Sequence, residues 1–222
     1  MTERIRVLLV DDDALVRAGL RLMLGGAPDI EVVGEAADGA AVAARVAETR
    51  PDVVLMDVRM PVLDGIEATR RLTAHGGGSA SVIVLTTFDA DATVLAALRA
   101  GAAGFLVKHT APERIVDAVR RAAAGEPVLS PTVARTLMDH VAAAERGGGR
   151  RERARERLAA LSERERAVAA AVAEGLSNGD IAERLHMSVG TVKAHISSAL
   201  TKLDLTNRIQ LALLAHDAAD GP

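Results

Sequence analysis

The first 125 residues alternate short apolar segments with amphipathic segments five times. The apolar segments are rich in Val, Ile and Leu, and most lack polar alternation, which is typical of strands buried on both faces of a parallel sheet. We expect strands at Ile5–Val10, Ile30–Ala36, Val53–Met56, Val82–Leu85 and Gly104–Val107. We expect helices near residues 14–25, 39–48, 65–75, 91–100 and 112–124. This repetition predicts a doubly wound α/β domain with a five-stranded parallel sheet over residues 1–125.

A different pattern begins near Leu158, where four short segments with helical periodicity follow one another without a strand signal. They predict an all-α four-helix domain over residues 158–217, with helices at 163–174, 178–186, 189–203 and 206–217. Residues 126–157 form the expected linker, with a helical segment at 131–144 and the sequence ERGGGRRERARER at 145–157. We interpret this charged sequence as solvated. A basic patch that contacts phosphates is the alternative.

The composition is that of an ordinary globular protein, with 49% hydrophobic and 26% charged residues. The chain has no Cys, which excludes disulfides and Cys-based metal sites. No apolar run approaches the roughly 20 residues of a membrane span, and the apolar start is interpreted as a strand, so we expect no membrane association and a cytoplasmic location. The net charge is −4 over residues 1–149 and +1 over 150–222, which does not by itself indicate a nucleic-acid partner.

Polar side chains follow four of the predicted strands. Asp11 and Asp12 follow the first, Asp57 the third, Thr86 the fourth and Lys108 the fifth. The carboxyl ends of parallel strands meet at one edge of the sheet, where ligands of open α/β sheets bind. We therefore expect these five side chains to form one site.

The residue types of this expected site favour phosphoryl chemistry. Three crowded carboxylates repel one another and need a divalent cation, and oxygen ligands suit Mg²⁺. A carboxylate beside such a cation can form an aspartyl phosphate, and Asp57 is the best nucleophile because it is the lone acid of VVLMD. Lys108 would supply a positive charge to a phosphoryl oxygen, and Thr86 a hydrogen bond.

The stretches LLVDDD, VVLMDVRMPVLDG, VIVLTTFD and GAAGFLVK resemble the four signature segments of receiver domains, in order and at suitable separations. The resemblance implies a flavodoxin-like receiver in which Asp57 accepts phosphate from a sensor histidine kinase. It also implies that Asp11, Asp12, Asp57 and the backbone carbonyl of Arg59 hold Mg²⁺.

The same resemblance implies that Thr86 and Lys108 bind the phosphoryl group, and that Phe105 is the switch aromatic that moves with Thr86. Phe105 as plain core is the alternative. The chain departs from many receivers at His109, where Pro is common, and this leaves open whether the Lys108–His109 peptide is cis. Asp13 stands where related regulators often carry His, and we interpret it as a helix cap.

The second domain carries the pattern of a helix-turn-helix. Ser162 and Glu165 form a capping box for its first helix. Ser188 caps a later helix that follows a tight turn, as a recognition helix for the DNA major groove does. The apolar face of this later helix comprises Val192, Ile196, Ala199 and Leu203, and the opposite face comprises Thr191, Lys193, Ala194, Ser197 and Ser198.

The segments Ser177–Leu185 and Thr191–His195 carry SN-x-x-IA-x-x-L and TVK-x-H, which resemble the DNA-binding domain of NarL/FixJ-type (LuxR-type) response regulators. The resemblance implies double-stranded DNA as a partner and a homodimer when active. It places Lys193, Ala194 and Ser197 on base edges, and it places Thr191, His195 and Arg208 on phosphates or the DNA backbone. A His195 side chain that merely packs or faces solvent is the alternative.

Two further classes compete with a phosphorylation-dependent regulator of transcription. Haloacid-dehalogenase-type phosphatases also form an aspartyl phosphate, but they need an acid two residues after the nucleophile, where this chain has Arg59. We therefore expect no turnover enzyme. An atypical regulator would bind DNA independently of phosphorylation and use the receiver for dimerisation; the complete acidic site argues against it. Because the linker is polar, we expect activation by release of the DNA-binding domain or by dimerisation.

Overall fold

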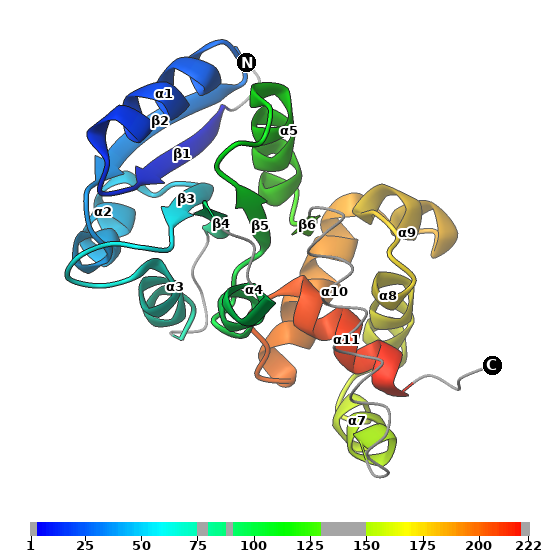
Figure 1. Cartoon of the computed structure of the whole chain (residues 1–222). Coiled ribbons are helices and arrows are strands. Elements are labelled where there is room, and N and C mark those ends of the chain that lie inside the picture. The colour runs from blue at the N-terminus through cyan, green and yellow to red at the C-terminus, as the bar shows by residue number, and fades with distance from the viewer. Residues whose placement is uncertain (1–3, 75–79, 88–90, 130–149, 219–222) are drawn as a thin grey trace. The chain divides into compact units, whose positions relative to one another are not determined.

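The computed structural model describes residues 4–74, 80–87, 91–129 and 150–218. The chain divides into two compact units, residues 1–133 and 134–222 (Figure 1). The helix predicted at 131–144 lies outside the described residues. Among the residues that are described, no helix is both long and apolar enough to cross a membrane.

The sheet of the first unit is entirely parallel and has the strand order β2-β1-β3-β4-β5-β6. The chain moves to one edge of the sheet, returns to the centre and then continues to the other edge, which confirms the doubly wound flavodoxin-like prediction. The strands are β1 (Ile5–Val10), β2 (Ile30–Ala36), β3 (Val53–Asp57), β4 (Ser81–Thr86), β5 (Gly104–Val107) and β6 (Val128–Leu129).

The short strand β6 corrects the predicted number of strands from five to six in the described part of the chain. Its two residues are too few to show any periodicity in the sequence. Gly104 allows β6 to pair with β5, because a Cβ atom at position 104 would lie 2.6 Å from the Cβ of Val128. The added strand extends the sheet at the edge beyond β5.

The helices cover both faces of this sheet (Figure 1). Helices α1 and α5 contact each other on one face, while α3 contacts both α2 and α4 on the other. The predicted helix at 39–48 begins as a 3₁₀ turn. The bounds are α1 (Ala14–Gly25), η1 (Gly39–Ala41), α2 (Val42–Thr49), α3 (Gly65–Thr73), α4 (Asp91–Arg99) and α5 (Pro112–Ala123).

Apolar side chains of the central strands and of α1 and α5 form the main core of the first unit. Leu9, Leu55 and Ile83 are fully buried, as expected of strands covered on both faces. Helix α1 begins after Asp13, whose carboxylate accepts a hydrogen bond of 2.8 Å from the Leu15 N–H. The interpretation of Asp13 as a helix cap is confirmed.

Helices are the only regular secondary structure in the described residues of the second unit. Ser162 and Glu165 form the predicted capping box at the start of α8, and Ser177 and Asp180 form another at the start of α9. Helix α8 packs against both α10 and α11 around one apolar core. The helices are α7 (Arg150–Leu158), α8 (Glu163–Ala173), α9 (Asn178–Arg184), α10 (Val189–Lys202) and α11 (Arg208–Ala218).

Helix α7 corrects the interpretation of residues 150–157 as solvated linker. It packs against α11, and its Ala154 is only 2% exposed. Arg157 donates a hydrogen bond to the Leu203 carbonyl, and Arg155 donates one of 3.2 Å to the Ala218 carbonyl. The sequence shows no apolar face here, because most residues of the helix are charged. The apolar surface that it buries comes from Ala and from the aliphatic parts of the arginine side chains.

Candidate functional site

Three carboxylates meet at the carboxyl edge of the sheet. Asp11 and Asp12 follow β1, and Asp57 is the last residue of the adjacent strand β3. One oxygen from each of these carboxylates lies within 4.8 Å of the others. Asp11 and Asp57 are buried, with 1% and 4% exposure, whereas Asp12 is exposed. The structure therefore brings together the three acids that the sequence predicts to form one site.

Lys108 reaches these acids from the end of β5. Its Nζ lies 3.0 Å from Asp57 Oδ1 and 2.6 Å from Asp11 Oδ2. The Lys108 backbone N–H donates a hydrogen bond of 2.7 Å to the Thr86 carbonyl, which anchors this residue to the end of β4. One ammonium group thus bridges carboxylates from two different strands.

The pKa values show how this charge cluster is balanced. Burial raises the pKa of the Asp57 carboxyl, and the Asp11 charge acts in the same direction, while Lys108 opposes both. Burial disfavours the Lys108 ammonium, but its contacts with Asp11 and Asp57 outweigh this cost and raise its pKa. A single ammonium does not neutralise three carboxylates, so the site favours a further cation.

The geometry of the Asp11 carboxylate fits that cation. Asp11 Oδ2 is buried, and it forms an ion pair with the Lys108 ammonium at 2.6 Å. Asp11 Oδ1 is oriented by a hydrogen bond of 3.0 Å from the Asp13 N–H. Carboxylate oxygens of Asp11, Asp12 and Asp57 within 4.8 Å of one another match the oxygen ligands that Mg²⁺ prefers.

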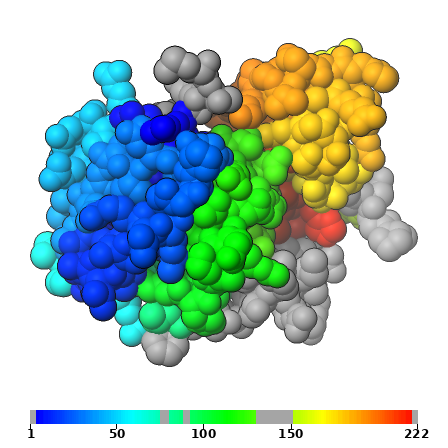
Figure 2. Space-filling view, turned by 90° about the horizontal axis from the view of Figure 1, so that it is seen from above, coloured from blue at the N-terminus to red at the C-terminus, as the bar shows by residue number. Residues whose placement is uncertain are grey.

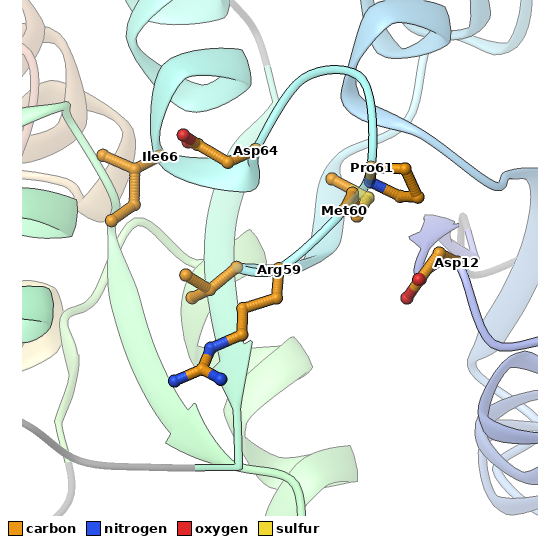
Figure 3. Close-up of a pocket in the computed structure, with 7 residues that line it drawn as sticks. Asp12, Arg59, Met60, Pro61, Asp64 and Ile66 are labelled. Carbon is orange, nitrogen blue, oxygen red and sulfur yellow. The ribbon is translucent and has the colours of Figure 1, made fainter.

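The β3–α3 loop, residues 58–64, forms one side of the site. Its end is fixed by Gly65, whose N–H donates a hydrogen bond of 2.9 Å to the Val58 carbonyl. A Cβ at position 65 would lie 1.8 Å from the Asp57 carbonyl oxygen, so only glycine fits there. This agrees with the prediction of a helix that begins near residue 65. The loop and Asp12 line the pocket of Figure 3, which comprises Asp12, Val58, Arg59, Met60, Pro61, Asp64 and Ile66.

Thr86 and Phe105 lie on β4 and β5, the two strands that follow β3 across the sheet. Thr86 ends β4 and is 4% exposed, and Phe105 on β5 is fully buried. In the parallel register Phe105 pairs with Val84, and Val107 pairs with Thr86. A buried Phe105 is compatible with core packing and with a switch, so the switch role stays a prediction. Within the described residues no peptide bond is cis, so the Lys108–His109 peptide is trans.

Helix α10 presents the predicted DNA-facing residues. Val192, Ile196 and Ala199 are buried against the core of the second unit. Ser188 caps the helix by accepting a hydrogen bond of 3.0 Å from the Thr191 N–H. The exposed face carries Thr191, Lys193, Ala194 and Ser197, and His195 at its border is half-buried.

Ser198, which the spacing places on or near the exposed face, and Arg208, which the resemblance places on the DNA backbone, both make hydrogen bonds within the second unit. Ser198 donates a hydrogen bond of 2.6 Å to Glu165 Oε1, so its hydroxyl belongs to the packing of α10 on α8. Arg208 is only 8% exposed, and its guanidinium donates to the Asn178 side-chain oxygen and to the Leu176 carbonyl. Arg208 therefore ties α11 to the start of α9, and its contact with the DNA backbone stays a prediction.

The sequence identifies Glu165 only as a cap. Its carboxylate is 4% exposed and also accepts two hydrogen bonds of 2.8 Å from Lys202. Hydrogen bonds from Lys202, Ser198 and the Ser162 N–H lower the pKa of Glu165 to about 2. The partners on α10 lie 33 and 37 residues away along the chain, so no local pattern reveals them.

Both units match known families. Residues 7–120 match the response regulator receiver domain, and residues 159–215 match the bacterial regulatory proteins of the luxR family. The chain is 41% identical to the transcriptional regulatory protein LiaR of Bacillus subtilis over 96% of this chain and 97% of LiaR. The chain therefore belongs to the two-component response regulators with a receiver and a LuxR-type DNA-binding domain.

Solved structures agree with this assignment. The response regulator ChrA of a heme-sensing two-component system is 38% identical, with a TM-score of 0.52 and 96% coverage of both chains. A structure of two RcsB dimers bound to two parallel DNAs is 27% identical, with a TM-score of 0.55 and coverage of 98% of this chain and 100% of RcsB.

Proposed function

We propose that this response regulator is switched by phosphorylation of Asp57 and that it then binds DNA through the exposed face of α10. The observation that carries the proposal is the placement of Asp57. Its carboxylate is buried, and the Lys108 Nζ that bridges it to Asp11 lies 3.0 Å from Asp57 Oδ1. The Asp57 carboxylate can attack the phosphorus of a phosphohistidine as a nucleophile. The P–O bond forms as the P–N bond breaks, and the imidazole is the leaving group.

Asp11, Asp12, Asp57 and the Arg59 backbone carbonyl would hold Mg²⁺, which neutralises charge on the transferred group when it is bound. Lys108 offers an ammonium to a phosphoryl oxygen, and Thr86 offers a hydroxyl that we propose moves toward the added oxygens. Arg59 stands two residues after Asp57, where a haloacid-dehalogenase-type phosphatase needs an acid. We therefore assign no turnover reaction to the site.

Partners follow from the same assignment. We propose a sensor histidine kinase as the phosphodonor, a cytoplasmic location and a homodimer as the DNA-binding form, which the RcsB dimers on DNA support by analogy. On α10, Lys193, Ala194 and Ser197 would face base edges, and Thr191 and His195 the DNA backbone. Ala194 and Ser197 offer few hydrogen bonds, so specificity would depend on Lys193, methyl contacts and DNA shape.

Phosphorylation of the full chain tests the proposal. Acetyl phosphate with Mg²⁺ should add one phosphoryl group by intact-protein mass spectrometry, and Asp57→Asn should abolish the addition. The matched control is Asp52→Asn. Asp52 directly precedes β3, at the amino end of the strand, so phosphorylation should not require it. Undiminished labelling of Asp57→Asn, or of the wild type in excess EDTA, would contradict the assignment.

A further inference from the structure

Asp38 connects two segments at the carboxyl edge of the sheet. It lies two residues after β2, and its Oδ1 accepts a hydrogen bond of 2.7 Å from the Ala40 N–H. Its Oδ2 accepts one of 2.9 Å from the N–H of Val62, in the β3–α3 loop. These hydrogen bonds, with a weaker one from the Leu63 N–H, lower the pKa of the Asp38 carboxyl, so it is ionised at neutral pH.

The neighbouring glycine brings the backbone of this segment against the same loop. Gly39 is buried, and a Cβ atom there would lie 2.3 Å from the Leu63 carbonyl oxygen. The approach is backbone against backbone, so it fixes the position of residues 62–63 closely. Two adjacent residues, Asp38 and Gly39, thus hold the far part of the β3–α3 loop.

The near part of the loop is held by the sheet. The Val58 N–H donates a hydrogen bond of 3.2 Å to the Leu85 carbonyl, and Gly65 closes the loop onto the Val58 carbonyl. The Val62 side chain is 79% exposed, so its packing contributes little to this order. Arg59 lies between these two fixed parts of the loop. The hydrogen bonds on both sides therefore restrict the direction of its carbonyl group.

We propose that Asp38 is a positioning residue for the divalent cation. It fixes the β3–α3 loop from outside the site and thereby sets the position of the Arg59 carbonyl and the affinity for Mg²⁺. The inference rests on the proposed function, since it needs the cation site at Asp11, Asp12 and Asp57. Partners that orient the ligands of a metal commonly change its affinity by about 10-fold or more when they are removed.

Direct titration of the unphosphorylated full chain with Mg²⁺, by isothermal calorimetry, tests this role. Asp38→Ala should raise the Kd for Mg²⁺ by about 10-fold. Asp38→Asn, which keeps one acceptor oxygen, should fall between Asp38→Ala and the wild type. The matched control is Asp52→Ala, because Asp52 also links a carboxylate to a distant backbone N–H, that of Arg6 at 2.8 Å, at the opposite edge of the sheet. Its Kd should equal that of the wild type.

Three results would be decisive. Failure of the wild type to bind Mg²⁺ overturns the cation site and the inference with it. Binding by the wild type with equal affinity in Asp38→Ala and Asp52→Ala overturns the inference alone. A weakened affinity that recovers at high salt identifies a long-range charge effect, because screening removes such effects and leaves a positioning effect intact; that result also overturns the inference.

Labelling by acetyl phosphate supplies an independent readout. In Asp38→Ala the Mg²⁺ concentration for half-maximal phosphorylation should rise with the Kd, while the extent at saturating Mg²⁺ should match the wild type. A lower extent at saturation with an unchanged Mg²⁺ midpoint would contradict a positioning role. If Asp38→Ala does not fold, the Asp38→Asn variant carries the same comparison.

Discussion

At the scale of single residues, Glu165 shows how a buried carboxylate can order the proposed DNA-binding surface without being part of it. It caps α8 through the Ser162 N–H and binds Ser198 and Lys202 on α10. Lys193 and Ser197 lie on the exposed side of the same helix. Glu165 therefore sets how α10 sits on α8, and with it where these side chains point.

Glu165→Gln should destabilise the second unit by about 1–3 kcal/mol at pH 7, because it removes charged acceptors from buried hydrogen bonds. The pKa of Glu165 is lowered from 4.5 to about 2 in the folded protein, so its stabilising effect is complete above pH 4.5 and is lost as the pH falls toward 2. The difference between wild type and variant should shrink over that range. Urea unfolding followed by circular dichroism measures it, with exposed Glu163→Gln as the control.

Lys193→Ala tests the exposed face of α10. A side chain that reads a base edge should cost about 1–3 kcal/mol of specific binding when it is removed. If Lys193 contacts only phosphate, affinity should fall about equally for specific and random duplexes. Titrating both duplexes at one salt concentration separates the two roles, and Arg153→Ala controls for the loss of one exposed charge. No loss on either duplex would mean that α10 is not the recognition helix.

At the scale of elements, the two units are stabilised by different means. The sheet is ordered by continuous apolar strands, and its functional side chains follow from where the strands end. The second unit instead depends on side chains that tie helix ends to one another. Arg208 joins α11 to the start of α9, and Arg157 on α7 reaches the carbonyl of Leu203 after α10. The Leu203 carbonyl lies at the C-terminal end of α10, where a cationic side chain is a favourable partner.

Ala154→Glu tests whether α7 is part of the folded second unit. Because Ala154 is 2% exposed in the contact between α7 and α11, a charged and larger side chain should cost at least about 2 kcal/mol of stability. Hydrogen exchange of the α11 amides in the full chain reports this loss. Arg153→Glu introduces the same residue at an exposed position of the same helix and should leave the exchange unchanged. Equal protection of the α11 amides in both variants would mean that residues 150–157 form a solvated linker, as the sequence predicts.

At the scale of the whole molecule, phosphorylation must change a binding equilibrium of the second unit. Turning a 1:99 mixture of states into 99:1 requires about 5.5 kcal/mol. A phosphoryl group need not supply all of this, because DNA with two half-sites also favours a dimer by linking two weak contacts. Release of the DNA-binding unit and dimerisation are the two routes that remain open.

We expect phosphorylated wild type to bind a two-half-site duplex more tightly than unphosphorylated wild type, and we expect Asp57→Asn not to respond. Sedimentation of the same samples measures whether dimers form in parallel. The fragment 150–222 separates the two routes, because it lacks the receiver but keeps α7. If this fragment binds no better than the unphosphorylated full chain, the receiver does not inhibit binding and dimerisation alone must carry activation.

Much of this molecule is determined by the sequence alone. Strands buried on both faces require continuous apolar runs, so β1 and β5 lie where the pattern predicts them. The partly exposed edge strand β2 also has its predicted bounds. Parallel strands end at one edge, so the positions of Asp11, Asp12, Asp57 and Lys108 after their strands suffice to group them in one site. In the second unit, local capping residues such as Ser162 and Ser188 indicate where helices begin.

Only the tertiary structure decided the partners of the polar residues. Arg208 binds Asn178, 30 residues away, and Asp38 binds Val62, 24 residues away, so neither contact leaves a periodic signal. An arginine near a recognition helix has the same local appearance whether it contacts a phosphate or a buried carbonyl. Strand β6 and helix α7 escape sequence-based prediction for a related reason, because packing against distant elements stabilises a two-residue strand and a short, highly charged helix, neither of which is long enough to be stable alone.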